Sequence, residues 1–331
     1  MIYYIESADT DPCLNLAREQ FVFEKLDRSH SYFMLWQNHN SIIVGKHQNT
    51  RAEINAAFTK AHNITVVRRL SGGGAVYHDL GNLNFTFITD ADSGQAIDFA
   101  AFCGPIQKAL ISFGVPVEIS GRNDMTVNGK KFSGNAQYIK ERRIMHHGTI
   151  LYDSDLTVLS QALNVTEDKI ESKGIKSVRS RVANIRPLMK DDVPIKDFWA
   201  ALKRYMFSAF DMHDYVFSEE ENAHVQELRN NVYAQWSWNY GASPACNLRK
   251  IRRVEGCGKI EILMDVEKGG IIKNAVFYGD FFGNADPEEL GNILAGRHLE
   301  YGELKNLLGG IDISRYFHNL DTETFLAILL E

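Results

Sequence analysis

The chain lacks the two glycine motifs that most often bind nucleotides in α/β proteins. Neither G-x-x-x-x-G-K-[ST] nor G-x-G-x-x-G occurs anywhere in its 331 residues. These absences exclude a P-loop and a dinucleotide-binding βαβ unit. Long apolar runs are missing as well, since none approaches the roughly 20 residues that a membrane-spanning helix needs. The sequence therefore predicts no association with a membrane.

Cysteine is scarce and carries no pattern. The four cysteines form neither a C-x-x-C pair nor a zinc-ligand spacing: Cys13, Cys103, Cys246 and Cys257. The N-terminal segment MIYYIESADTDP also lacks the basic and apolar regions of a signal peptide. We therefore expect reduced thiols in a cytoplasmic protein.

Basic residues are outnumbered overall but concentrated in the middle of the chain. The net charge is −6, yet residues 121–190 contain 13 Lys and Arg against 7 Asp and Glu. This distribution predicts an anionic ligand or an acidic partner surface, although a solvated basic face would look the same. Nucleic acid is not expected, because the rest of the chain would repel phosphate and no basic–aromatic recognition motif is present.

The pattern of elements predicts a large α/β domain with mixed sheets, followed by a small α+β domain. Its predicted strands include residues 1–5, 32–36, 41–45, 64–67 and 82–88. Its predicted helices cover residues 10–26, 51–62, 155–163, 195–211 and 219–232. Asp11 and Pro12 suit the start of the first helix. A further helical stretch, 96–114, is expected to begin a new helix at Pro105 and to stop at Gly114.

A domain junction is expected within WSWNYGASPACN (236–247), where Gly241 and Pro244 interrupt the pattern. The predicted domains are therefore residues 1–245 and 246–331. The second should contain a hairpin and two amphipathic helices. Their expected ranges are 259–267 and 271–282 for the hairpin, and 286–295 and 300–308 for the helices.

Residues 68–79, RRLSGGGAVYHD, form the most informative segment of the chain. Glycine lets backbone N–H groups approach a phosphate, and Arg68 and Arg69 could add charge-assisted hydrogen bonds. In the following strand, NLNFTFI (82–88), apolar residues alternate with Asn84 and Thr86, which predicts a half-buried strand. A glycine-rich turn flanked by solvated arginines would show the same pattern.

A second segment, GRNDMTVNGKKFSGNAQ (121–137), predicts a hairpin that turns at its Asn-Gly pair. Lys130 lies nearest the turn and is expected to meet water. Lys131 lies one residue deeper, on the opposite face, and could hold a phosphate or a developing oxyanion. An ordinary surface lysine remains an alternative. Asp124 could hold Mg²⁺ beside phosphates, or simply cap a turn.

A third segment, ESKGIKSVRSRVANI (171–185), is basic and has little apolar periodicity. It reads either as a mobile loop that closes over an anionic ligand or as an ordinary solvated connection. His78, His146 and His147 could bind metal or move protons, but their spacing matches no known zinc motif.

Together and in this order, these segments resemble the lipoate–protein ligase family. The similar blocks are 41–49, 68–82, 121–137, 146–151, 173–185, 236–241 and 265–271. The resemblance implies a large α/β domain of the biotin/lipoate ligase type, with mixed sheets flanked by helices, and a small C-terminal domain. It also implies a two-step reaction. The carboxylate of lipoate attacks the α-phosphate of MgATP to give lipoyl-AMP and pyrophosphate. A lysine of a lipoyl-domain protein then takes the lipoyl group.

The resemblance also assigns roles by motif position. Lys131 would contact both the carboxyl and the phosphate oxygens. The ATP and lipoyl-adenylate site is assigned to Arg69, Ser71, Gly72, Gly73, Gly74, Ala75, Val76, Tyr77, Asp124, Lys131 and Gly134. The lipoate pocket is assigned to Trp36, His78 and His147. The loop over the adenylate would contain Lys173, Gly174, Lys176, Arg179 and Arg181.

The implied acceptors are acyltransferase subunits of 2-oxoacid dehydrogenases and the glycine-cleavage H protein, and a monomer is the default expectation. Two other functions stay open. An octanoyl or lipoyl transferase that works without ATP would need an activated cysteine, and none lies in residues 121–185. A lipoate-binding protein without turnover would have no need of Arg69 and Lys131.

Overall fold

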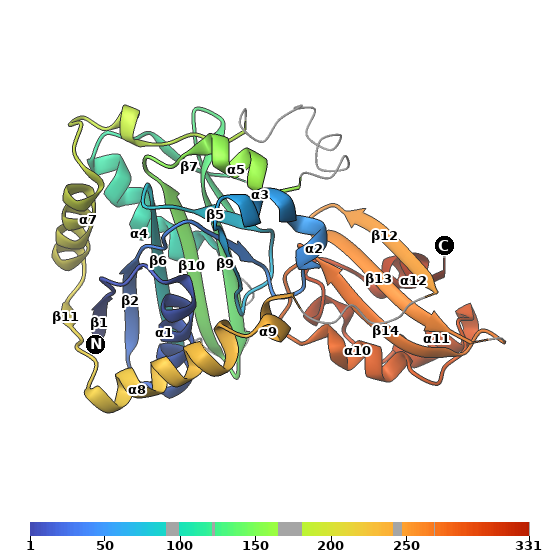
Figure 1. Cartoon of the computed structure of the whole chain (residues 1–331). Helices are drawn as coiled ribbons and strands as arrows, with labels where there is room; N and C mark the ends of the chain where they lie inside the picture. Colours follow the sequence, from blue (N-terminus) through green and yellow to red (C-terminus); the bar gives the residue numbers. More distant parts are fainter. Residues whose placement is uncertain (91–98, 121–122, 165–180, 241–246, 268, 331) are drawn as a thin grey trace.

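The computed structural model describes residues 1–90, 99–120, 123–164, 181–240, 247–267 and 269–330. Figure 1 shows a large body of mixed sheets and helices, with a smaller body of strands and helices beside it. In the part of the chain that is described, no helix is both long enough and apolar enough to cross a membrane.

An eight-stranded sheet in the order β11-β1-β2-β6-β10-β9-β8-β7 forms the centre of the large body. Its first three strands run parallel and the others pair antiparallel. The strands are β1 (Ile2–Glu6), β2 (Ser31–Trp36), β6 (Asn82–Asp90), β7 (Val117–Ser120), β8 (Asp124–Val127), β9 (Lys130–Lys140), β10 (Arg143–Leu151) and β11 (Met212–Asp214). The short β11 has no counterpart among the predicted strands.

Helices cover both faces of this sheet. On one face, α4 (Phe99–Ser112) and α7 (Ile195–Ala209) enclose a core with Phe33, Leu83 and Phe85. On the other face lie α1 (Pro12–Lys25) and α8 (Glu219–Leu228), together with a second sheet. Because both faces are covered, Asn84 and Thr86 are buried as deeply as their apolar neighbours. The prediction of a half-buried strand at 82–88 was therefore wrong.

The second sheet has the order β4-β3-β5 and includes the strands on either side of the glycine segment. They are β3 (Ser41–Val44), β4 (Thr65–Arg68) and β5 (Val76–His78), and α2 (Thr50–Glu53), α3 (Ala56–Ala61) and α5 (Leu156–Ala162) accompany them. The predicted helix at 51–62 is two short helices. The chain breaks between them because Ile54 forms a bridge with Leu163 and Asn55 caps α3.

Two other helix predictions need correction. Pro105 does not start a helix, because α4 runs through it without a break. The helix survives the lost backbone hydrogen bond because it buries Cys103, Ile106 and Leu110 on one face. The helix predicted for 219–232 ends at Leu228 and continues as a π-helical turn over Arg229–Tyr233. Asp11 caps α1 and Pro12 opens it, as expected.

The small body is a three-stranded antiparallel sheet packed against helices. Its elements are β12 (Leu248–Val254), β13 (Gly258–Val266), β14 (Ile272–Gly279), α10 (Pro287–Leu294), α11 (Tyr301–Leu308) and α12 (Thr322–Leu330). β13 and β14 form the predicted hairpin. The edge strand β12 was missed, because four of the seven residues in LRKIRRV are basic and hide the alternation. A short helix, α9 (Trp236–Tyr240), precedes this body where only an interruption was expected.

Candidate active site

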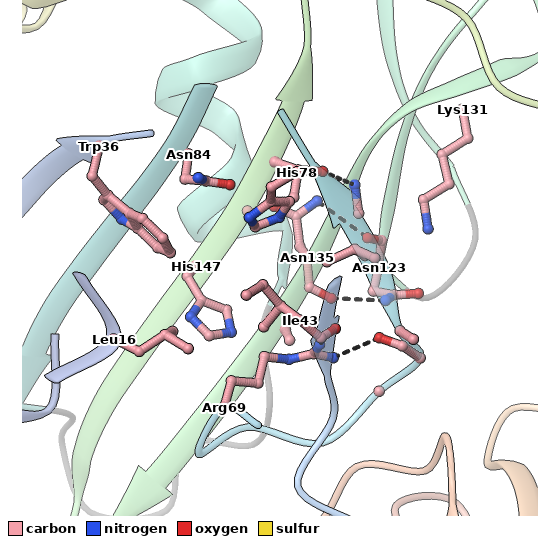
Figure 2. Close-up of a pocket in the computed structure, with 18 residues that line it drawn as sticks. Leu16, Trp36, Ile43, Arg69, His78, Asn84, Asn123, Lys131, Asn135 and His147 are labelled. Atoms are coloured by element: carbon pink, nitrogen blue, oxygen red, sulfur yellow. Dashed lines mark hydrogen bonds between the residues drawn. The ribbon is translucent and has the colours of Figure 1, made fainter. Parts of the chain in front are cut away.

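A cavity of about 100 Å³ lies between the two sheets of the large body, with α1 at one end. Figure 2 shows Leu16 and Trp36 at one end of its lining and Lys131 at the other. Many residues assigned from sequence line it: Trp36, Arg69, Gly73, Gly74, Ala75, Val76, His78, Lys131, Gly134 and His147. Segments that are far apart along the chain therefore meet at one site.

Other assigned residues do not form its wall. Ser71 lies behind the wall, Gly72 packs beneath the small body, and Asp124 contacts the cavity only through Lys131. Tyr77 points the other way, into the core of the second sheet, where its hydroxyl donates to Oδ1 of Asn40 at 3.1 Å. The covering-loop residues Lys173, Gly174, Lys176 and Arg179 lie outside the described residues.

Arg69 organises the glycine segment from inside. Its guanidinium donates to the carbonyl oxygens of Gly72 at 2.6 Å and Gly74 at 2.9 Å, and to that of Ile43 at 3.1 Å. These contacts fold the glycines around the cation. Burial lowers the pKa of Arg69 to about 10, an effect that the nearby Glu19 partly offsets. Arg69 therefore stays charged at neutral pH and brings a positive field to the cavity wall.

Arg68 does not offer hydrogen bonds to a phosphate in the cavity, contrary to the interpretation of the sequence. Its guanidinium turns into the protein and donates to the carbonyl oxygens of Gly45, Lys46 and Gln48 at 2.8–2.9 Å. It also donates to Trp238 of α9. Arg68 thus ties the loop after β3 to α9, and its donors serve the fold rather than a ligand.

A buried hydrogen-bond chain links the glycine segment to the apolar end of the cavity. Nε of Arg69 donates to Oγ of Ser71 at 2.9 Å, and Ser71 lies 2.6 Å from Nε2 of His147. Nδ1 of His147 lies 2.9 Å from Oε1 of Glu19. The hydroxyl of Thr86 donates to the same carboxylate at 2.6 Å and accepts from Nε1 of Trp36 at 2.9 Å.

Glu19 belongs to this hydrogen-bond network, and the sequence did not identify it as a site residue. It is a buried carboxylate, 2% exposed, on α1. An acidic residue in an amphipathic helix ordinarily marks the solvent side, so periodicity could not single it out. Three groups interact with its side chain: the imidazole of His147, the hydroxyl of Thr86 and the charge of Arg69.

Lys131 enters the cavity from the hairpin of β8 and β9. Its backbone is held by the described part of the basic segment 171–185, since its N–H donates to the carbonyl of Arg181 at 2.8 Å. Its Nζ forms an ion pair with Oδ1 of Asp124 at 2.8 Å. A Cβ on Gly134 would lie 2.9 Å from that Nζ, so glycine leaves room for the lysine. Lys130 is exposed, as alternation predicted.

No protein-built metal site is present in the described ranges. They contain no group of three or more His, Cys, Asp or Glu side chains that could hold an ion. Asp124, the proposed magnesium ligand, instead neutralises Lys131. Burial keeps two histidines of this region neutral, because it lowers the pKa of His78 to about 3 and that of His146 well below its usual range.

Several lining residues had no sequence signal of their own. These are Leu16, Ile43, Asn84, Asn123, Asn135, Ala136, Gly148 and Thr149. Gly148 shows why the wall is tight at this point. A Cβ there would overlap both the ring of Phe85 and Oδ1 of Asn135, so only glycine fits between them.

The small body closes the outer side of the glycine segment. The N–H of Gly73 donates to the carbonyl of Phe281 at 3.2 Å. A Cβ on Gly72 would overlap that same carbonyl oxygen. Nζ of Lys46 forms an ion pair with Asp286 at 2.7 Å. The two bodies therefore meet directly on the backbone that forms one wall of the cavity.

Comparisons with known proteins agree with this architecture. The family model for the lipoyl protein ligase A/B catalytic domain matches residues 11–207, and that for the bacterial lipoate protein ligase C-terminus matches residues 243–329. Lipoate-protein ligase LplJ of Bacillus subtilis is 42% identical over 99% of this chain and 100% of its own length.

Two solved structures share the fold. LipL1 of P. falciparum, solved in complex with lipoate, has a TM-score of 0.79 at 23% identity, covering 100% of this chain and 98% of the other. A bi-partite lipoate protein ligase from Thermoplasma acidophilum, studied with its E2 lipoyl domain, has a TM-score of 0.64 at 26% identity, covering 74% and 98%. Since a family model matches more than half of the chain and a relative matches along its whole length, the chain belongs to the lipoate–protein ligase family.

Proposed function

We propose that the chain activates lipoate with MgATP and transfers the lipoyl group to a lysine of lipoyl-domain proteins. One observation carries this proposal. One cavity has Leu16 and Trp36 at one end and Lys131 at the other. Arg69 and the glycine backbone also line it. An acid with a long apolar tail needs such a slot, and an acyl phosphate needs such cations where charge develops.

In the first step, the carboxylate of lipoate attacks the α-phosphate of ATP, and pyrophosphate leaves. Lys131 is assigned to hold the carboxylate and phosphate oxygens together, because its ammonium can neutralise both. Arg69 and the N–H group of Gly74 are assigned to the phosphate side, since the N–H of Gly73 already donates to Phe281. The Asp124 ion pair keeps Lys131 in place until the substrates compete for it.

Magnesium enters with ATP rather than as a resident ion. Mg²⁺ is commonly held by one or two carboxylates together with substrate phosphates. Asp124 is the one assigned carboxylate beside the cavity, and it would have to exchange Lys131 for the ion. The metal is therefore part of the MgATP substrate.

In the second step, the ε-amine of the acceptor lysine attacks the acyl carbon of lipoyl-AMP, and AMP leaves. The adenylate must be sheltered from water until then. The segment from Lys173 to Arg181 is assigned this task, since its end at Arg181 is hydrogen-bonded to the backbone of Lys131. Acceptors of the 2-oxoacid dehydrogenase and glycine-cleavage H classes, a monomeric state and a cytoplasmic location belong to the same proposal.

A thioester route finds no support among the described cysteines. None of them lines the cavity, and Cys13, Cys103 and Cys257 are all buried. Burial raises the pKa of Cys13 to about 11, which disfavours the nucleophilic thiolate. Cys103 lies 3.8 Å from Nε2 of His146, but both side chains are buried, and the ring of His146 packs against Phe99 and Phe102.

The test is lipoylation of a recombinant lipoyl domain, followed by mass spectrometry. The wild type should modify the domain with lipoate, ATP and Mg²⁺ and not when ATP is omitted. A variant with all four cysteines changed to serine should retain activity within several-fold, after allowance for lost stability. A folded cysteine variant that transfers nothing, beside a thioester adduct in the wild type, would establish the transferase instead.

A further inference from the structure

Two buried nitrogens on the cavity wall have no hydrogen-bond partner among the described residues. They are Nδ2 of Asn84 and Nε2 of His78. Asn84 is 1% exposed and His78 is 3% exposed, and both line the cavity. Figure 2 shows them between Trp36 and Lys131. Buried polar groups in proteins are ordinarily paired, so these two nitrogens indicate a ligand that forms hydrogen bonds with them.

The surrounding network fixes the nitrogen of His78 as an N–H donor. Nδ2 of Asn15 donates to Oδ1 of Asn38 at 3.0 Å. The amide of Asn38 must then present its NH₂ group to Nδ1 of His78, 3.2 Å away. A neutral imidazole that accepts at Nδ1 carries its proton on Nε2. The ring is neutral because burial lowers its pKa to about 3.

The nitrogen of Asn84 belongs to an amide NH₂ group and is therefore a donor. Nδ2 of Asn82 donates to Oδ1 of Asn84 at 2.8 Å. The oxygen of the Asn84 amide is therefore engaged along the strand, and its NH₂ group is left for the cavity. The wall thus presents two N–H donors to which no described residue is hydrogen-bonded.

These donors lie where the tail of the substrate must run. Asn84 is the register partner of Trp36 across β2 and β6. The rings of Trp36 and His78 have centroids 6.3 Å apart and meet edge to face. A substrate with its carboxylate at Lys131 lays its tail toward Trp36, because these residues mark opposite ends of the lining. The two donors therefore meet the tail and not the carboxylate.

We propose that Asn84 and His78 make the cavity specific for a sulfur-bearing tail, by directing N–H groups at the dithiolane sulfurs of lipoate. This inference rests on the function proposed above. A divalent sulfur is a weak acceptor, whereas a methylene accepts no hydrogen bond and leaves a buried donor unsatisfied. When an analogue leaves buried polar groups of the site unpaired, the site discriminates strongly against that analogue. The structure thus favours lipoate over octanoate.

The test separates the sulfurs from the shape of the ring. Lipoate-dependent pyrophosphate release by the full-length chain is compared with release driven by octanoate and by 5-cyclopentylpentanoate, which keeps a five-membered ring without sulfur. We expect kcat/KM for lipoate to exceed that for the cyclopentyl acid by about ten- to a hundredfold. Equal values would overturn the specificity while leaving the ligase function intact. Release from none of the acids would overturn the proposed function, and this inference with it.

Two variants then test which residues discriminate between lipoate and the cyclopentyl acid. Asn84→Leu and His78→Phe remove one donor each, and each should reduce the lipoate-to-cyclopentyl ratio by about tenfold without changing KM for ATP. His78→Gln can keep an N–H near the same position and should retain most of the ratio. Ser41→Ala is the matched control, because Ser41 is buried opposite His78 in the β3–β5 pairing but does not line the cavity.

Partial loss of folded protein cannot mimic the effect, because both acids are measured on the same preparation. A ratio that stays at the wild-type value in both Asn84→Leu and His78→Phe would contradict the inference.

Discussion

Nζ of Lys131 lies 2.8 Å from Oδ1 of Asp124, so the cation at one end of the cavity is already paired with a carboxylate. The pair is partly exposed, with 37% of the lysine side chain and 22% of the aspartate side chain accessible. An exposed pair of this kind contributes little stability, about 0–1 kcal/mol. Its effect is to keep the ammonium at the cavity, where substrate oxygens can replace the carboxylate.

Lys131→Ala should lower the rate of lipoyl-AMP formation by on the order of 10²–10³, because it removes a cation from the developing charge. Lys130→Ala is the control on the same strand, and its exposed side chain predicts a change of no more than a few-fold. Radiolabelled ATP would follow adenylate formation directly. Equal losses in the two variants would show that the two strand faces have been misassigned.

Glu19→Ala should lower kcat/KM for lipoate by about ten- to a hundredfold, because His147 and Thr86 would both lose a buried acceptor. Gln20→Ala changes the next residue of α1, whose side chain contacts Tyr233 and Glu24 and not the cavity. It should leave kcat/KM near the wild-type value. If both variants lose activity in proportion to stability in urea, Glu19 contributes only to folding.

The free energy of unfolding should fall as the pH is lowered from about 6.5. Burial lowers the pKa of His47 and of His78 to about 3, and that of His146 well below its usual range. Between these values and about 6.5 the unfolded chain binds more protons, so acid favours unfolding by up to about 1.4 kcal/mol per pH unit for each histidine.

Urea unfolding at pH 7 and pH 5 measures this slope. His146→Gln should reduce it, because it removes one of the buried histidines. An unfolding free energy that is independent of pH in this range would contradict the assignment of neutral buried histidines.

Residues 1–245 alone should activate free lipoate poorly but still transfer from preformed lipoyl-AMP. The truncation removes Phe281, whose carbonyl accepts from Gly73, and Phe282, which packs against Phe99 and Ala136. The glycine wall would lose its outer support, while Arg69 and Lys131 remain.

The two half-reactions are to be assayed separately, after circular dichroism has shown that the truncated protein is folded. Asp286→Ala breaks the ion pair with Lys46 and removes the side-chain cap of α10, but it leaves Phe281 in place and should cost less than several-fold in activity. A truncated protein that adenylates normally but cannot modify the acceptor would make the small body a docking element.

The sequence identified those parts of the site at which the residue type alone indicates a role. Three glycines after an arginine, and a lysine beyond an Asn-Gly turn, identify backbone and charge that face a ligand, and both segments line the cavity. The hairpin of the small body was found for the same reason, because a Gly-Gly turn separates its strands.

The sequence pattern could not predict which way a side chain points, because tertiary packing sets that direction. Arg68 and Arg69 are adjacent and identical in type, yet one faces the cavity and the other secures α9. Asn84 looks like the solvent face of a strand until a second sheet covers it. Glu19 looks like the polar side of a helix, and only the fold brings His147 to it.

The most direct test of the account is pyrophosphate release by the purified chain in the presence of ATP and Mg²⁺, with and without lipoate. The account predicts release that depends on lipoate, accompanied by lipoyl-AMP that can be isolated from the protein and chased to AMP by a lipoyl domain. Release that is absent, while the lipoyl domain is still modified without ATP, would contradict it and establish a transferase that needs no nucleotide.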